Sequence, residues 1–160
     1  MNIVIFGCDN SGKTTLGKVL DDFLGGYIHS PGPLDNIEDM KEFIESNLDK
    51  STVNIFDRFP PIEEYACGTV LRNENKFEDE YEYVREIFDK IDLFIYCCPD
   101  LDFVCNWGSR DQMDGIKENI YKLREKYDDI YLSLLIAGKP VVKYDYNKQG
   151  RYIKYQEVVN

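Results

Sequence analysis

Gly7-Cys8-Asp9-Asn10-Ser11-Gly12-Lys13-Thr14 is the stretch that decides the fold. It matches the pattern G-x-x-x-x-G-K-[ST] and directly follows the apolar run 3–6. The residues after it carry hydrophobic side chains at helical spacing: Leu16, Val19, Leu20, Phe23 and Leu24. A buried strand, a glycine-rich turn and an amphipathic helix in this order form the context of a phosphate-binding loop.

The loop has the chemistry that a nucleoside triphosphate needs. Its two glycines let the backbone curl so that successive N–H groups point inward at an anion. The helix that begins at Lys13 adds its positive N-terminal end. Lys13 would reach the β- and γ-phosphates of ATP, and the Thr14 hydroxyl would hold Mg²⁺. The residues expected to contact ATP are Asn10, Ser11, Gly12, Lys13, Thr14 and Thr15.

The composition is that of a globular, strongly acidic protein. The chain has 160 residues, 43% hydrophobic and 31% charged, so we expect one domain over 1–160 with its own core. Its formal net charge of −11 makes polymeric nucleic acid an unlikely partner, because that contact needs a basic stripe. No apolar run approaches the ~20 residues of a membrane span, and no signal-peptide pattern opens the chain, so no membrane partner is expected.

The cysteines favour a reducing compartment. There are five, an odd number, with no C-x-x-C pair, and the chain has one histidine, His29. A structural zinc site is therefore not expected, and reduced thiols in the cytoplasm are the simplest interpretation. His29 precedes a Pro-Gly turn, where a structural hydrogen bond is the expectation and a ligand contact the alternative.

Strand and helix patterns alternate along the whole chain. Strands are predicted at 3–6, 27–28, 52–56, 93–98 and 141–144. Helices are predicted at 16–24, 37–48, 62–70, 77–88, 102–107 and 116–134. The alternation implies right-handed βαβ crossovers, and hence a three-layer α/β/α fold with a mainly parallel five-stranded sheet. The tail 150–160 is open between an edge strand and loose packing.

Ligands bind at the carboxyl ends of the strands in such a fold. Asp57 follows the predicted strand 52–56, where a carboxylate can position Mg²⁺. Arg58 offers a planar fork for a second phosphate. The alternative is that Asp57 caps the next helix and Arg58 pairs with a surface carboxylate. Arg110 lies in a polar, glycine-bracketed segment, predicted as a lid over about 107–115, and could close over the γ-phosphate or stay solvated.

These motifs resemble those of the thymidylate kinase family. The stretch 7–15 resembles the family's loop G-x-D-G-x-G-K-T-T, and Asp57-Arg58-Phe59 resembles its D-R-[YF] signature. Pro31-Gly32 falls where the family has a Pro-Gly substrate loop, and the order of elements agrees over about 1–145. The compact length is similar to that of phage-encoded members. The resemblance implies a P-loop (deoxy)nucleoside monophosphate kinase.

The resemblance also implies an acceptor. The expected reaction is phosphoryl transfer from ATP to a deoxynucleoside monophosphate, with dTMP as the leading candidate. In this family pattern, Asp9 would contact the sugar 3′-hydroxyl, Arg58 the acceptor phosphate, and Phe59 would border the base. Members of the family often form homodimers, so a homodimer is a further expectation.

The residues that would act on the transferring phosphoryl group follow from the same comparison. Lys13 and Arg110 would stabilise it, with Mg²⁺ held near Thr14 and Asp57, and together with Arg58 on the acceptor phosphate these residues are the expected catalytic set: Lys13, Arg58, Arg110 and Asp57. Positioning and charge neutralisation then do most of the catalysis. Because the loop residues between its two glycines are not basic, the prediction for a lid charge rests on Arg110.

The chain departs from the family where the base is read. The family often continues D-R-[YF]-x-x-S-x-x-A-Y-Q, and its Ser and Gln help to place thymine. Ile62 and Cys67 stand at those spacings here, so the base is left open. The paired lid arginines are also reduced, because Asn106 stands ahead of Arg110.

Two other functions are left open. One is a P-loop kinase that phosphorylates a hydroxyl, of a nucleoside or of a modified base in DNA, with Asp57 as general base. The other is a nucleotide-binding regulatory protein without transferase activity. The stretch 147–150 superficially resembles the guanine-reading N-K-x-D, but Gly150 replaces its aspartate, and no D-x-x-G follows Asp57.

Overall fold

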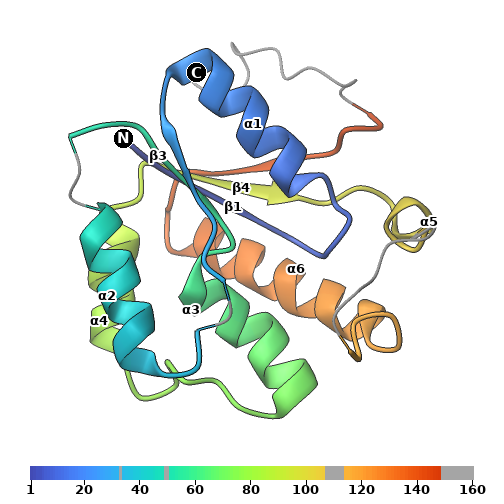
Figure 1. Cartoon of the computed structure of the whole chain (residues 1–160). Coiled ribbons are helices and arrows are strands. Elements are labelled where there is room, and N and C mark those ends of the chain that lie inside the picture. The colour runs from blue at the N-terminus through green and yellow to red at the C-terminus, as the bar shows by residue number, and fades with distance from the viewer. Residues whose placement is uncertain (33, 49–50, 107–113, 149–160) are drawn as a thin grey trace.

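The computed structural model describes residues 1–32, 34–48, 51–106 and 114–148. Five strands form its sheet: β1 (Asn2–Phe6), β2 (Tyr27–His29), β3 (Asn54–Asp57), β4 (Leu93–Cys97) and β5 (Val141–Tyr144). Their order across the sheet is β2-β3-β1-β4-β5 (Figure 1). All four pairings are parallel, which confirms the predicted parallel sheet and places β1 at its centre.

Helices cover both faces of this sheet. They are α1 (Lys13–Leu24), α2 (Ile37–Leu48), α3 (Pro60–Glu63), η1 (Glu64–Arg72), α4 (Tyr81–Asp89), α5 (Leu101–Val104) and α6 (Ile120–Ile136). Figure 1 shows α1 on one side of the strands and α2, α3, α4 and α6 on the other. The predicted three-layer α/β/α arrangement is therefore confirmed.

The central strand explains why its sequence is apolar throughout. Val4 and Phe6 belong to the larger hydrophobic cluster, in which they pack with buried residues of α2, α3, α4 and α6. Ile3 and Ile5 point to the opposite side, where Leu16 and other residues of α1 cover them. A strand buried on both faces has no polar side to alternate with, as expected for parallel sheets covered by helices.

Element boundaries differ from the predictions at several places, most clearly in three of the helices. The predicted helix 77–88 begins at Tyr81, because the segment before it forms a turn in which the Asn75 side chain accepts the Phe77 N–H. The predicted helix 116–134 begins at Ile120, after a turn that includes Gly115 at φ +83°. The predicted helix 62–70 is a short α-helix, α3, that continues as the π-helix η1.

Some expectations concern parts outside the described residues. They are residues 107–113 of the predicted lid (about 107–115), which include Arg110, and the tail from 149 onward. Across the described part of the chain, no helix is both long enough and apolar enough to cross a bilayer.

The core gives a stability prediction. Phe56 is fully buried and packs edge-on against Phe43 and Phe59, with ring centroids 6.2 and 5.2 Å away. Phe56→Ala is expected to lower the free energy of unfolding by about 3–5 kcal/mol. The matched change Phe23→Ala removes a ring that is 62% exposed and is expected to cost less than about 1 kcal/mol. Urea unfolding of both variants measures the difference, and equal losses would contradict this assignment of the core.

Candidate functional site

The phosphate-binding loop connects the central strand to the first helix. It leaves β1 at Phe6, and α1 begins at Lys13. Because β3 lies beside β1 in parallel, with Ile5 opposite Asp57, the Asp57 carboxylate reaches the same edge of the sheet as the loop. The Thr14 hydroxyl donates to Asp57 Oδ2 at 2.8 Å, so the two predicted magnesium residues are in direct contact.

The loop needs glycine at both ends of the motif. Gly7 has φ +139°, and a methyl group there would collide with the carbonyl oxygen of Cys97. Gly12 has φ +88°, and a methyl group there would lie 3.1 Å from the ring of Tyr146. The curl that results leads directly into α1, whose first N–H groups have no acceptor within the helix. These groups and the helix dipole favour an anion at this point.

The Lys13 side chain turns back against the backbone of the phosphate-binding loop. Its side chain is 6% exposed, and Nζ donates to the carbonyl oxygens of Gly7 at 2.7 Å and Cys8 at 2.8 Å. The nearest oxygen of Asp9 is 3.7 Å away. The ammonium group is thus held by weakly charged acceptors at the position where an anion on the loop would meet it.

Arg58 faces the loop from the neighbouring strand. Its guanidinium donates to Asp9 Oδ1 at 3.0 Å. Burial by itself lowers the pKa of Arg58, but the carboxylates of Asp9 and Glu63 outweigh it and raise the pKa above its usual value. The backbone of Arg58 has φ +73°, a left-handed conformation that costs about 1–2 kcal/mol for a residue with a side chain. Strain of this kind is found at functional sites, where the surrounding structure compensates it.

The Asp57 carboxylate has an oxygen that the protein leaves unpaired. Asp57 is 3% exposed, and Oδ1 is buried without a hydrogen-bond partner, whereas Oδ2 accepts from Thr14. A carboxylate and a hydroxyl at the end of a phosphate-binding loop are hard oxygen ligands, which Mg²⁺ prefers. These two residues therefore fit the ion that the motif implies. Within the described residues, no group of three or more His, Cys, Asp and Glu could hold a metal ion.

The other predicted site residues differ in placement. The Asn10 side chain donates to the backbone carbonyls of residues 103, 104 and 106, at 3.1–3.3 Å, and so fastens the loop to α5. Ser11 is buried, with an unpaired hydroxyl, and Thr15 is exposed on α1. Phe59 is fully buried, and its ring lies edge-on to that of Phe56 with 5.2 Å between the centroids.

Two predictions outside the phosphate-binding motif can also be compared with the structure. His29 Nε2 makes a hydrogen bond of 3.1 Å with Asn54 Oδ1 and so takes part in the structural contact expected of it. All five cysteines are free thiols. Burial raises the pKa of Cys8, in the loop, and of Cys67 to about 12, so both are protonated at neutral pH.

Sequence reasoning missed Glu63, whose carboxyl group is near enough to Arg58 for their charges to act on each other. Tyr127 OH donates to its Oε2 at 3.1 Å, and the Cys67 thiol lies 3.7 Å from the same oxygen. The other oxygen, Oε1, is buried without a partner. Burial raises the pKa of Glu63, and the positive charges of Lys13 and Arg58 partly oppose that rise. The only signal in the sequence was a glutamate two residues after a pair of prolines, which is common at a helix start.

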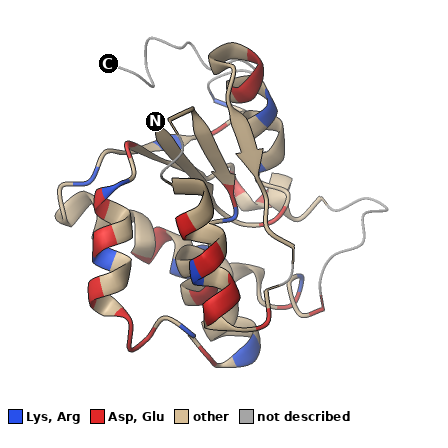
Figure 2. Cartoon of the chain, turned by 60° about the vertical axis from the view of Figure 1, so that its left-hand side comes forward, with Lys and Arg blue, Asp and Glu red and all other residues tan. Residues whose placement is uncertain are grey.

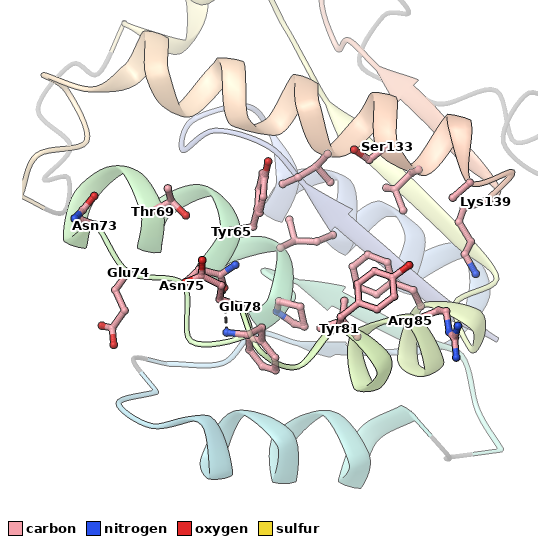
Figure 3. Close-up of a pocket in the computed structure, with 18 residues that line it drawn as sticks. Tyr65, Thr69, Asn73, Glu74, Asn75, Glu78, Tyr81, Arg85, Ser133 and Lys139 are labelled. Atoms are coloured by element: carbon pink, nitrogen blue, oxygen red, sulfur yellow. Dashed lines mark hydrogen bonds between the residues drawn. The ribbon is translucent and has the colours of Figure 1, made fainter.

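A pocket of about 800 Å³ lies between η1, α4 and α6 (Figure 3). Tyr65 of η1, Tyr81 and Arg85 of α4, and Ser133 of α6 are among the residues that line it. None of the residues predicted from the phosphate-binding motifs does. Pro61 and Ile62 line this pocket, but the next residue, Glu63, does not. The pocket and the phosphate-binding loop are therefore separate features.

Acidic side chains dominate the described surface. Figure 2 shows them along the helices, with fewer Lys and Arg between them. The contact between Asp9, Lys13 and Arg58 therefore stands out as a place where two cations meet at the end of the sheet. Two cations held close together in this way attract small anions in spite of the net charge of −11.

Comparisons with known proteins agree with the fold. No protein-family model and no curated protein sequence matches the chain. Among solved structures, YorR protein from Bacillus subtilis, in complex with phosphorylated GDP, is 19% identical with a TM-score of 0.72, covering 92% of this chain and 87% of its own. Deoxyadenosine kinase from M. mycoides with bound dATP is 16% identical with a TM-score of 0.65, covering 92% of both chains.

A third similar structure is the thymidylate kinase from Candida albicans. It is 14% identical with a TM-score of 0.55, and the match covers 90% of this chain and 83% of the other. This chain has the α/β/α fold of P-loop nucleotide kinases. The fold that the motifs predicted is thereby confirmed.

Glu63 yields a prediction on stability. Since burial raises its pKa in the folded protein above the ordinary value of 4.5, the fold is favoured below that pH and loses this advantage as the pH rises through the folded pKa. Glu63→Gln removes the ionisation. The melting temperature of the variant minus that of the wild type is therefore expected to be more positive at pH 8 than at pH 4.

Glu64→Gln is the matched control for this measurement. Glu64 is 5% exposed and pairs with Arg72, so its loss is expected to lower the melting temperature at pH 8. A Glu63→Gln difference that is the same at both pH values would show that burial does not act on this carboxyl group.

Proposed function

We propose that the protein transfers the γ-phosphoryl group of ATP to a deoxynucleoside monophosphate, with dTMP as the leading acceptor. One observation carries the proposal. Lys13 Nζ and Arg58 Nη2 approach the same oxygen, Asp9 Oδ1, at 3.7 and 3.0 Å, so the two cationic nitrogens lie less than about 7 Å apart. Two cations at that spacing can both contact a phosphoryl group that passes from a donor on the loop to an acceptor phosphate beside Arg58.

The proposed mechanism assigns a role to each side chain of this contact. Lys13 exchanges its carbonyl partners for oxygens of the donor's β- and γ-phosphates. Arg58 binds the acceptor phosphate through its planar fork and leaves Asp9, which then accepts a hydrogen bond from the acceptor's 3′-hydroxyl. A phosphate oxygen is already a nucleophile near neutral pH, so the chain needs no general base for this reaction. Arg110 is proposed as the cation that completes charge neutralisation.

Thr14 and Asp57 would hold Mg²⁺. The hydroxyl of Thr14 and the unpaired Oδ1 of Asp57 are the oxygens that support this assignment. When bound, the ion would screen the negative charge of the transferring phosphates. The chain's own part is to hold both oxygens in register, since one belongs to α1 and the other to the end of β3.

A hydroxyl acceptor is the second candidate function. The unpaired Oδ1 of Asp57 could take the proton of an attacking hydroxyl, as a nucleoside kinase requires. One of the similar structures is a deoxyadenosine kinase, which makes nucleosides a necessary part of any acceptor test. The third possibility, a regulatory protein that binds nucleotide without transferring phosphate, is excluded by turnover with any acceptor.

The test is an acceptor panel with γ-labelled ATP and Mg²⁺. The panel contains dTMP, dUMP, dCMP, dGMP, dAMP, modified pyrimidine monophosphates, the matching nucleosides and single-stranded DNA. Formation of a labelled nucleoside diphosphate is expected, with dTMP as the best acceptor. Label in nucleosides or DNA alone would overturn the monophosphate assignment in favour of a hydroxyl acceptor, and no labelled product would favour the regulatory protein.

Lys13 gives the first prediction on activity. Lys13→Ala is expected to reduce turnover at least about 100-fold, because it removes the cation from the transferring phosphoryl group. Lys18→Ala, on the exposed face of the same helix, is the matched control and is expected to leave turnover within about two-fold of the wild type. Circular dichroism confirms that both variants fold. Retained turnover in a folded Lys13→Ala protein would remove the role given to this residue.

Arg58 gives the second prediction on activity. Arg58→Lys keeps the charge but loses the fork, so KM for the monophosphate is expected to rise at least about 10-fold while KM for ATP changes little. Arg85→Lys makes the same exchange on α4, in the separate pocket, and is expected to change neither constant. The assignment to the acceptor side fails if KM for ATP rises instead.

A further inference from the structure

The Glu63 carboxyl group is held by the protein on one side only. Its Oε2 accepts from Tyr127 OH at 3.1 Å and lies 3.7 Å from the Cys67 thiol, which is placed by the π-helix η1. Its Oε1 is buried and has no hydrogen-bond partner. Buried carboxyl oxygens without a donor are rare, because each costs about 1–3 kcal/mol or more. π-Helical turns are rare in proteins and are frequently found at functional sites.

The charges around Glu63 connect it with the phosphate-binding loop. The groups whose charges act on it most strongly are Lys13, Arg58 and Asp9, in that order. In turn, Glu63 is second only to Asp9 among the carboxylates that act on Arg58. The pocket on the other side of α3 includes Pro61 and Ile62 but not Glu63. Glu63 therefore belongs to the side of α3 where the two cations lie.

We propose that Glu63 is a specificity-determining residue of the acceptor site, where its Oε1 accepts a hydrogen bond from a sugar hydroxyl of the acceptor. The inference rests on the proposed function for the nature of the acceptor. Because Tyr127 donates to Oε2, the unpaired Oε1 is the oxygen left for a ligand, and a hydroxyl group is its simplest partner. A hydroxyl suits Oε1 in either protonation state of the carboxyl group, whereas the ionised form repels a phosphate, so the group it recognises is a neutral donor. On a nucleotide or nucleoside near the phosphate site, that donor is an alcohol.

Tyr127 is a positioning residue in this arrangement. It is 2% exposed and packs against Phe6, with ring centroids 6.4 Å apart, so its hydroxyl is fixed by the core. By donating to Oε2 it leaves Oε1 as the oxygen available to the acceptor. Two different hydroxyl groups could supply this hydrogen bond to Oε1. One is the 3′-hydroxyl of a monophosphate and the other is the 5′-hydroxyl of a nucleoside.

The experiment measures binding, so that it does not depend on turnover. Full-length protein with Mg²⁺ and a non-hydrolysable ATP analogue is titrated with dTMP, dCMP, dAMP and dGMP and with their 2′,3′-dideoxy counterparts. A second arm compares thymidine with 5′-deoxythymidine and deoxyadenosine with 2′,5′-dideoxyadenosine. The quantity compared is the affinity ratio between each hydroxyl-bearing ligand and its partner without that hydroxyl, in the wild type and in Glu63→Gln and Glu63→Ala.

The ratio is expected to fall about 10-fold in both Glu63 variants, because the hydrogen bond to a buried carboxyl oxygen is lost. Asp9 contacts the same sugar in the proposed mechanism, but it is present in every protein compared and cancels from the change. Tyr127→Phe is expected to lower the ratio by a smaller factor. Glu64→Gln, the adjacent buried glutamate paired with Arg72, is expected to leave it unchanged.

The two arms separate this inference from the proposed function. A fall in the 3′-hydroxyl arm supports both. A fall in the 5′-hydroxyl arm alone supports the role of Glu63 and overturns the monophosphate as acceptor. Unchanged ratios in both Glu63 variants, or an equal fall in Glu64→Gln, overturn the inference, while the labelled-ATP panel still decides the reaction. If the wild type binds none of these ligands, both are wrong.

Discussion

The contact of Lys13 and Arg58 with a single oxygen of Asp9 is the interaction on which the site depends. Two cations near one another repel, and in a partly buried setting that repulsion is strong. Asp9 Oδ1, 3.7 Å from one and 3.0 Å from the other, offsets it. The same ion pair helps to hold Arg58 at φ +73°, a conformation that a surface arginine would abandon. The fold thus keeps two positive charges together by placing one negative charge between them.

The sheet order makes this contact possible. Asp9 follows β1, Arg58 follows β3, and these strands are direct neighbours that run in parallel, so both residues leave the sheet at the same edge. β4 on the other side of β1 contributes the carbonyl oxygen of Cys97, which fits closely over Gly7. The site residues lie at the ends of the strands, and the contribution of the sheet is to hold the ends of β1, β3 and β4 in a fixed alignment.

The fold could be predicted because its signals are local and periodic. The apolar run before the loop, the helical spacing after it and the alternation of elements are properties of short windows, and the structure confirms them. The π-helix η1 could not be predicted, since π and α turns share nearly the same hydrophobic spacing. Strand and helix ends shifted where side chains such as Asn75 form turns that override the apolar pattern.

The site could be predicted only where a motif marks it. Lys13, Thr14, Asp57 and Arg58 stand in such motifs, and the structure brings them together. Glu63 stands in no motif. Its importance follows from the hydrogen bond with Tyr127, which is far away in the sequence and on another helix. Phe59 matches a family signature, and its ring also packs in the core, 5.2 Å from that of Phe56, so the motif alone does not say how much of the ring a ligand could reach. Side-chain direction after a strand end is a tertiary property that the motif does not encode.

The balance of charge in the site also indicates what kind of ligand it selects. Asp9 lies between Lys13 and Arg58, and the Glu63 carboxyl group is near enough for their charges to act on it, so the site combines acidic and basic groups. An anion that takes the cations leaves the carboxylates without their partners, which is costly at buried positions. Inorganic phosphate offers nothing in exchange. A phosphorylated sugar carries the anion and the hydroxyl donors in one molecule and can satisfy both sides at once, so the arrangement favours nucleotides over smaller anions of the same charge.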